Sequence, residues 1–331
     1  MESKVKNLPE IILCGYERGG TTMLSELFRS NNYESGFECG VLMCKQPYDF
    51  VNYQPYFNMM INGWNIELPL LKKACNGNFK VFYTQLVDKS AISFHDRRVF
   101  DKTPIYMRNL GRALYRTEFI NKACVIHRDP RSVFVSWAKR VKEKNQSIES
   151  CIEVNMNNFC DRYVSYFIGS IAHINNPNVL FIPFEEMTTR EDLYYKTIGM
   201  FAIGHPFSKR SSESRFENVS GKNMDLSKVL EYKKHLGNEI QERILNKTRL
   251  ASIFFANVDD REKYGQYWIN VSSQINDLLD HFNITYLYKD INGTYFEPFT
   301  YLLRYNDLLK AKVNPEMHFR NYGIREGRAG S

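Results

Sequence analysis

The chain has 331 residues, of which 43% are hydrophobic and 24% are charged, and its formal net charge is +7. The hydrophobic content supplies the core of one large domain or two ordinary ones, and the charged fraction is that of an average globular protein. The basic balance favours anionic partners, with a mildly basic solvated surface as the alternative, but no run of Lys and Arg is long enough to predict a nucleic-acid partner.

The first predicted elements are a buried strand at residues 11–14, a glycine-rich turn, and an amphipathic helix that starts near Thr21. This order is typical of phosphate sites in α/β proteins, because backbone N–H groups and the helix dipole meet at the turn. Gly15 to Thr22 has the spacing of a nucleotide phosphate loop, but Thr21 stands in place of its lysine, and the nearest cation is Arg18. The turn predicts a phosphate site unlike that of a standard nucleoside triphosphate; a glycine turn without a ligand is the alternative.

Downstream, strands alternate with helices. Strands are predicted at residues 98–104, 123–127 and 178–183, and helices at 106–115, 131–143, 150–173, 185–203 and 226–246. This alternation predicts a P-loop-like, three-layer α/β/α fold with a central parallel sheet, in which ligands bind at the carboxyl ends of the strands. The glycine turn, Lys102 and Arg128 all follow such ends, so we expect three phosphate-binding or cationic tips on one edge.

Two further stretches have a character of their own. Residues 45–90 are rich in aromatic side chains and are expected to wall a pocket or, as the simpler alternative, to form an aromatic core. Residues 204–223 are predicted to be a basic loop.

The helix predicted at 131–143 has a clear start, because Asp129 is a favourable N-cap and a proline follows it. Arg128 lies just before the cap, and Ser136 lies two turns into the helix on an adjacent face. Three apolar residues at i, i+4 and i+8 are expected to face inward: Val133, Trp137 and Val141.

Beyond residue 250 the composition shifts toward Asn, Tyr and Asp, with a predicted turn at Asn292-Gly293. We therefore expect three parts: a first domain at 1–250, a connecting helical segment at 251–290, and a small C-terminal helical module at 291–331.

The seven cysteines are scattered and form no C-x-x-C pair, which predicts reduced, mostly buried thiols rather than disulfides or a metal site. No apolar stretch is long enough for a signal peptide or for a membrane span of about 18 residues. We therefore expect a cytoplasmic protein without a membrane span; nothing indicates its oligomeric state.

Together these motifs resemble the sulfotransferases that use 3′-phosphoadenosine 5′-phosphosulfate (PAPS), most closely the bacterial and Golgi-type members, over residues 8–245. The segment Arg18-Gly19-Gly20-Thr21-Thr22 resembles their R/K-S/G-G-T-T loop. The segment Arg128-Asp129-Pro130-Arg131, followed by Ser136, resembles their R-D-P-R strand end and serine. Asp101-Lys102-Thr103-Pro104 resembles a K-[ST]-P strand tip, and Phe184-Glu185-Glu186-Met187 resembles Y-E-D-L with Phe in place of Tyr.

The resemblance implies a role for each matching residue. The residues implied to bind the nucleotide are Arg18, Gly19, Gly20, Thr21 and Thr22 at the 5′-phosphosulfate, and Arg128 and Ser136 at the 3′-phosphate. Arg18 and Lys102 would also neutralise charge that develops at the sulfonyl end. No metal is implied, because a sulfuryl group carries less charge than a phosphoryl group.

The implied catalytic base is Glu38, twenty residues after Arg18, where Golgi-type tyrosine and glycan enzymes carry a glutamate. A solvated turn glutamate is the alternative, and Asp101 and His95 are the fallback bases. The catalytic His of the cytosolic members has no counterpart in Lys102-Thr103-Pro104.

The implied reaction moves a sulfuryl group from PAPS to an acceptor hydroxyl and leaves 3′,5′-adenosine bisphosphate (PAP). The aromatic stretch and the basic balance favour a carbohydrate acceptor; a lipid, a peptide or a small metabolite stays open. One rival function is that of a P-loop ATP kinase, which needs a Lys at position 21.

The second rival is a non-catalytic protein that binds through its C-terminal module. Residues 301–328 resemble a short helical module of bacterial proteins with the pattern Y-L-x-x-Y-x-D-L, H-[YF] and G-x-x-E-G-R. Two roles stay open for it: docking onto the catalytic domain and contact with a polymer.

Overall fold

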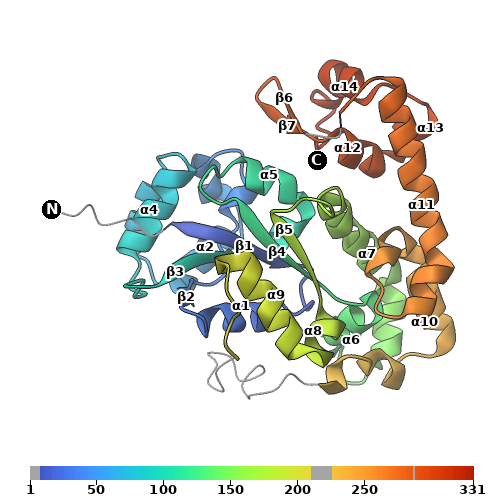
Figure 1. Ribbon diagram of the computed structural model, residues 1–331, viewed down its shortest axis with the longest axis horizontal. Coiled ribbons are helices and arrows are strands. Elements are labelled where there is room, and N and C mark those ends of the chain that lie inside the picture. The colour runs from blue at the N-terminus through green and yellow to red at the C-terminus, as the bar shows by residue number, and fades with distance from the viewer. Residues whose placement is uncertain (1–7, 210–225, 286–287) are drawn as a thin grey trace. The chain divides into compact units, whose positions relative to one another are not determined.

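The computed structural model describes residues 8–209, 226–285 and 288–331, and Figure 1 labels the strands and most of the helices. The described chain forms two compact units. Unit 1 contains residues 8–107, 113–127, 176–209 and 226, and unit 2 contains residues 108–112, 128–175, 227–285 and 288–331. Most of the basic loop predicted at 204–223 lies outside the described residues.

Unit 1 is built on a five-stranded, all-parallel sheet with the strand order β2-β3-β1-β4-β5 (Figure 1). The strands are β1 (Pro9–Gly15), β2 (Tyr33–Glu34), β3 (Arg98–Lys102), β4 (Lys122–His127) and β5 (Val179–Pro183). The central strand β1 pairs with β3 on one side, where Leu13 lies opposite Lys102, and with β4 on the other. The carboxyl ends of these three strands are therefore neighbours. The predicted parallel sheet is confirmed, and the two-residue edge strand β2 is an addition.

Helices cover both faces of this sheet, which confirms the predicted three-layer α/β/α fold. On one face lie α1 (Thr21–Arg29), α8 (Phe184–Thr189) and α9 (Glu191–Ile203). They pack on alternate strand residues, among them Leu13, Phe100 and Ile126. Asp101 points to the opposite face, because successive side chains of a strand alternate. There its carboxylate meets Tyr83 of α4 (Phe79–Lys89).

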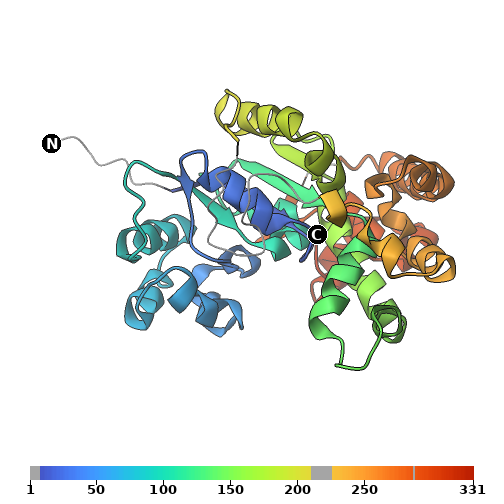
Figure 2. The ribbon, with the colours of Figure 1, turned by 90° about the horizontal axis from the view of Figure 1, so that it is seen from below.

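The aromatic stretch 45–90 forms a group of short helices on one side of unit 1 (Figure 2). They are η2 (Pro47–Asn52), α2 (Tyr56–Gly63), α3 (Leu68–Ala74) and α4. Most of their large rings form a core: Phe50 packs edge-on against Phe57 and Phe82, and the buried Trp64 stacks on Phe94. The aromatic-core interpretation therefore holds for these side chains.

Unit 2 is mainly helical. Its longer elements are α6 (Pro130–Val141), α7 (Ile148–Ile171), α10 (Asn238–Lys247) and α11 (Val258–His281). After α11 come the antiparallel hairpin β6 (Lys289–Ile291) and β7 (Thr294–Phe296), then α12 (Pro298–Arg304), α13 (Asn306–Lys310) and α14 (Pro315–His318). The hairpin turns at Asn292-Gly293, where both residues have positive φ, as their composition predicts. The strands beside it were not predicted.

The C-terminal segment packs against α7 within unit 2. The buried carboxylate of Glu297, at the N-cap of α12, lies 2.8 Å from Nε2 of His173, which follows the C-cap of α7. Burial alone raises the pKa of the Glu297 carboxyl, but its contacts with His173 and Tyr295 outweigh burial and lower it. Gly111 leaves room for this cluster, because a Cβ there would lie 2.1 Å from Glu297 Oε1.

Four sequence predictions of local structure need correction. The helix predicted at 226–246 is instead two short 3₁₀ turns followed by α10, because Gly237 is extended and begins α10 as its N-cap. The helix predicted at 185–203 breaks at Arg190 into α8 and α9. The helix at 106–115 begins as a 3₁₀ turn, η3 (Pro104–Asn109), before α5 (Leu110–Tyr115). Val141 is 48% exposed rather than inward, because it is the last residue of α6.

Cysteine chemistry agrees with the sequence prediction, since all seven cysteines are described and are buried free thiols. Among the described residues, no three or more His, Cys, Asp or Glu side chains are grouped to hold a metal ion. Within the same part of the chain, no helix combines the length and apolar character needed to cross a lipid bilayer.

Candidate functional site

The turn between β1 and α1 has the geometry of an anion site. Arg18 and Gly20 have positive φ angles of 67° and 105°, and the Gly19 N–H donates to the Tyr16 carbonyl at 2.9 Å. Gly20 is the N-cap of α1, with no side-chain cap and no acidic residue in the first turn that Thr21 and Thr22 begin. The start of α1 therefore presents its first N–H groups and the positive end of its dipole.

Gly20 cannot be replaced without strain. Besides its positive φ, an added Cβ would lie 2.7 Å from the Phe184 ring and 3.0 Å from Ile126. Phe184 belongs to the segment predicted to match Y-E-D-L, so this segment supports the turn by packing against it.

Glu38 and Lys102, predicted from distant parts of the chain, lie together in unit 1. Lys102 Nζ donates to Glu38 Oε1 at 3.1 Å, with side-chain exposures of 3% for the lysine and 17% for the glutamate. The ammonium also lies 4.7 Å from the centre of the Phe37 ring, a cation–π contact. Since Lys102 pairs in register with Leu13 of β1, this pair lies at the strand end beside the one that leads into the glycine turn.

The loop that carries Glu38 is held from both sides. Before Glu38, the Phe37 N–H donates to the Gly63 carbonyl at 2.7 Å, and Trp64 Nε1 donates to the Phe37 carbonyl at 2.6 Å. After Glu38, Gly40 has a φ of 80° and lies so close to the Tyr56 ring that a Cβ would clash. Glu38 is therefore placed by fixed backbone rather than by a mobile turn.

Thr103 joins this loop to the strand that carries Lys102. Its hydroxyl donates to Asp101 Oδ1 at 2.7 Å and accepts the N–H groups of Cys39 at 2.9 Å and Gly40 at 3.3 Å. One donor and two acceptor positions are all that a hydroxyl has, so each is used. The sequence indicates Thr103 only as part of a strand tip and carries no signal for these long-range contacts.

The two alternative bases, Asp101 and His95, lie in environments different from that of Glu38. Asp101 is fully buried and accepts hydrogen bonds from Tyr83 at 2.5 Å and Tyr106 at 3.0 Å, besides that from Thr103. Burial raises the pKa of the Asp101 carboxyl, although the three hydroxyl hydrogen bonds act in the opposite direction. His95 is 85% exposed and pairs with Asp96 at 2.7 Å.

We predict that Thr103→Val will slow turnover and lower stability together. Valine keeps the shape but leaves two buried N–H groups without their acceptor, which costs about 1–3 kcal/mol in the free energy of unfolding. Displacement of Glu38 should lower kcat by about 10- to 100-fold. Thr103→Ser, which retains the hydroxyl, should restore both.

Thr117→Val is the matched control for that comparison. It removes another buried hydroxyl of unit 1, one that donates to the Ala113 carbonyl at 3.1 Å, and should lower stability without a specific loss of kcat. Equal kcat values for the Val and Ser variants at position 103 would show that Thr103 does not position Glu38. Denaturant unfolding measures the free energy of unfolding of each variant, and steady-state kinetics measure its kcat.

In unit 2, Arg128 is held at the start of α6. Its carbonyl accepts the Tyr163 hydroxyl at 2.7 Å, and its Nη2 donates to the Lys228 carbonyl at 2.6 Å. The side chain is buried, and Ser136 lies half-buried further along α6. Tyr163 and Lys228 are far from Arg128 in sequence, and no local signal indicates them.

The Asp129 cap is reinforced by Arg131, whose Nε and Nη2 donate to both carboxylate oxygens at 2.9 and 2.7 Å. Arg131 also donates to Asp260 of α11 at 2.7 Å and lies 4.2 Å from the Tyr232 ring centre. Burial opposes the charge on Arg131, but these acids raise the pKa of its guanidinium. This network is structural and fixes the turn that follows β4.

The fold and the glycine turn place the molecule in the class of P-loop-like α/β proteins. Within that class, the sulfotransferase-domain family model matches residues 8–251, so the chain belongs to the sulfotransferase family. This confirms the family resemblance drawn from the motifs. No curated protein matches the chain.

Several sulfotransferases are among the solved structures similar to this chain. The sulfotransferase domain of the Synechococcus PCC 7002 olefin synthase is 15% identical, with a TM-score of 0.48 over 75% of this chain and 96% of that one. The mouse sulfotransferase SULT7A1, solved in complex with PAP, is 15% identical, with a TM-score of 0.46 over 79% of this chain and 89% of that one.

Proposed function

We propose that this protein transfers a sulfuryl group from PAPS to an acceptor hydroxyl on a carbohydrate. The observation that carries the proposal is the Lys102–Glu38 pair, 3.1 Å apart, at the strand end beside the glycine turn. A cation and a proton acceptor at one point, next to an anion site, suit an in-line transfer in which an oxyanion leaves and a hydroxyl attacks.

The predicted nucleotide-binding residues suit the phosphate groups of PAPS by their chemistry. The first N–H groups of α1 and Arg18 suit the 5′-phosphosulfate. Arg128 and Ser136 supply a guanidinium and a hydroxyl, which suit the 3′-phosphate. When bound, PAPS supplies the activated sulfuryl group and a phosphate leaving group.

Glu38 would accept the proton of the acceptor hydroxyl, and Lys102 and Arg18 would stabilise the negative charge on the leaving side. Because sulfuryl transfer resembles phosphoryl transfer, positioning and electrostatics supply most of the catalysis. We propose no metal, because the lower charge of a sulfuryl group leaves less to neutralise.

A carbohydrate acceptor is supported by the net charge of +7, which favours acidic glycans. The seven buried free thiols support a reducing, cytoplasmic setting. If no carbohydrate is sulfated, a lipid, a peptide or a small metabolite is the acceptor class to test next.

Calorimetric titration with PAP and with Mg²⁺–ATP tests the donor assignment. We expect PAP to bind and ATP to bind poorly, because Thr21 replaces the phosphate-loop lysine. Arg128→Ala should weaken PAP binding by about 10- to 150-fold, since a charge-assisted contact contributes about 1.5–3 kcal/mol.

Arg140→Ala, which removes an exposed arginine in the last turn of α6, is the control and should leave PAP binding unchanged. Hydrolysis of ATP by the pure protein would favour the kinase alternative. Unchanged PAP affinity in Arg128→Ala would show that the 3′-phosphate site lies elsewhere.

A further inference from the structure

Unit 1 has a polar depression between η2 and α3, which we call the η2–α3 groove. Its volume is about 550 Å³, within the range of small-molecule sites. Its lining includes Tyr48, Asn52, Pro69, Lys72, Lys73 and Asn76.

Tyr48 and the polar side chains that line this groove make no ring contact, ion pair or side-chain hydrogen bond among the described residues. Tyr48 is 64% exposed and has no ring partner or side-chain hydrogen bond among the described residues. In the same part of the chain, Lys72 and Lys73 make no ion pair, and the side-chain amides of Asn52 and Asn76 make no hydrogen bond. An aromatic face, two amides and two ammonium groups are thus presented together.

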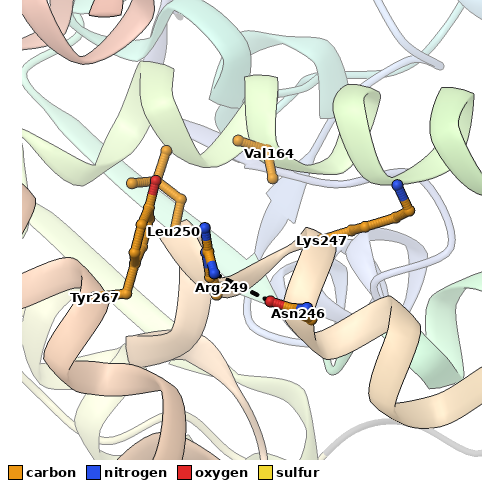
Figure 3. A pocket seen from close by; sticks show the side chains of 6 residues that line it. All are labelled: Val164, Asn246, Lys247, Arg249, Leu250 and Tyr267. Carbon is orange, nitrogen blue, oxygen red and sulfur yellow. Dashed lines mark hydrogen bonds between the residues drawn. The ribbon is translucent and has the colours of Figure 1, made fainter. Parts of the chain in front are cut away.

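In a pocket of unit 2, by contrast, side chains of the same kinds contact one another (Figure 3). It has a volume of about 410 Å³ and is also lined by a tyrosine, an asparagine and two cations. There Arg249 donates to Asn246 Oδ1 at 3.2 Å and lies 4.1 Å from the Tyr267 ring centre. Its aromatic, amide and guanidinium groups satisfy one another, whereas those of the η2–α3 groove are available to a ligand.

We infer that the η2–α3 groove binds an anionic oligosaccharide and is a holding site for the acceptor, an inference that rests on the proposed function. A sugar ring packs flat on an exposed aromatic ring, and Tyr48 with Pro69 supplies such a face. Side-chain amides pair with sugar hydroxyls, which both donate and accept. Lys72 and Lys73 complement carboxylate or sulfate groups, and their charge selects an acidic chain over a neutral one.

The groove is connected to the Glu38 loop by a short, fixed path. The turn η1 (Val41–Met43) follows that loop directly and packs against η2. The Leu42 N–H is held by the Tyr106 hydroxyl at 3.3 Å. A chain bound in the groove therefore lies on elements anchored to the same backbone that places Glu38.

Titration of the full-length protein with three tetrasaccharides tests the inference: hyaluronan (carboxylated), chondroitin sulfate (sulfated) and chitotetraose (neutral). We expect at least one anionic probe to bind more tightly than chitotetraose. The double variant Lys72→Gln/Lys73→Gln should weaken anionic binding about tenfold or more and remove that preference. Tyr48→Ala should weaken the binding of all three.

The control is Lys80→Gln/Lys89→Gln, which removes the same charge from the neighbouring helix α4. Equal weakening by both double variants would show a general charge effect and overturn the inference, as would equal affinity of the wild type for anionic and neutral probes. Because these titrations contain no nucleotide, they succeed or fail independently of PAP binding, which tests the proposed function.

Discussion

Glu38→Gln is expected to lower kcat by about 10²-fold or more while leaving the affinity for PAP nearly unchanged. Glutamine keeps the size of the side chain and its ability to accept a hydrogen bond from Lys102, but it has no basicity. A general base acts only as the hydroxyl loses its proton, so its loss appears in kcat rather than in nucleotide binding. Single-turnover kinetics with PAPS, together with PAP titration, makes the measurement.

The matched control is Glu67→Gln, an exposed glutamate of unit 1 at the N-cap of α3 that makes no side-chain cap. It should change neither quantity. A Glu38→Gln enzyme with normal kcat would remove Glu38 from the mechanism. Asp101 and His95 would then be tested in that order, although the burial of Asp101 among three hydroxyls makes it a poor proton acceptor for a substrate.

Lys102→Met is expected to lower kcat by about 10²- to 10³-fold, the usual loss when one preorganised group that stabilises transition-state charge is removed. Methionine keeps the apolar stem that packs beside Phe37 and removes only the cation. Only 3% of the Lys102 side chain is exposed, so solvent cannot replace its ammonium group.

A double-mutant cycle separates catalysis from the loss of the ion pair. If Lys102 and Glu38 act as a unit, the double variant should be little slower than the worse single variant, because effects within a unit are not additive. The exposed Lys80→Met is the control for charge. Additive losses would show that the two side chains act independently, and a normal kcat in Lys102→Met would exclude its proposed role.

Local sequence patterns were enough for the elements whose signals are confined to neighbouring residues. The apolar run of β1, the glycines after it and the start of α1 follow from backbone freedom and periodicity within about twenty residues. The start of α6 is equally local, because Asp129 accepts the Arg131 N–H two residues on. By contrast, periodicity alone does not reveal that Gly237 is extended and starts α10, or that α6 ends at Val141 and leaves this side chain exposed.

For the candidate site, too, the sequence predicted which residues take part, and the tertiary structure decided which of them lie together. The sequence motifs were enough to recognise the family. They predicted the phosphate turn, and the resemblance implied roles for Lys102, Glu38 and Arg128, which stay predictions. Only the tertiary structure decided that Lys102 and Glu38, 64 residues apart in sequence, lie 3.1 Å apart, because parallel pairing of β2 with β3 places the loop after β2 beside the end of β3. The tertiary structure also decided that the Thr103 hydroxyl binds the Glu38 loop. A buried hydroxyl pairs with hydrogen-bonding groups that lie near it in space, and these partners can be far away in sequence.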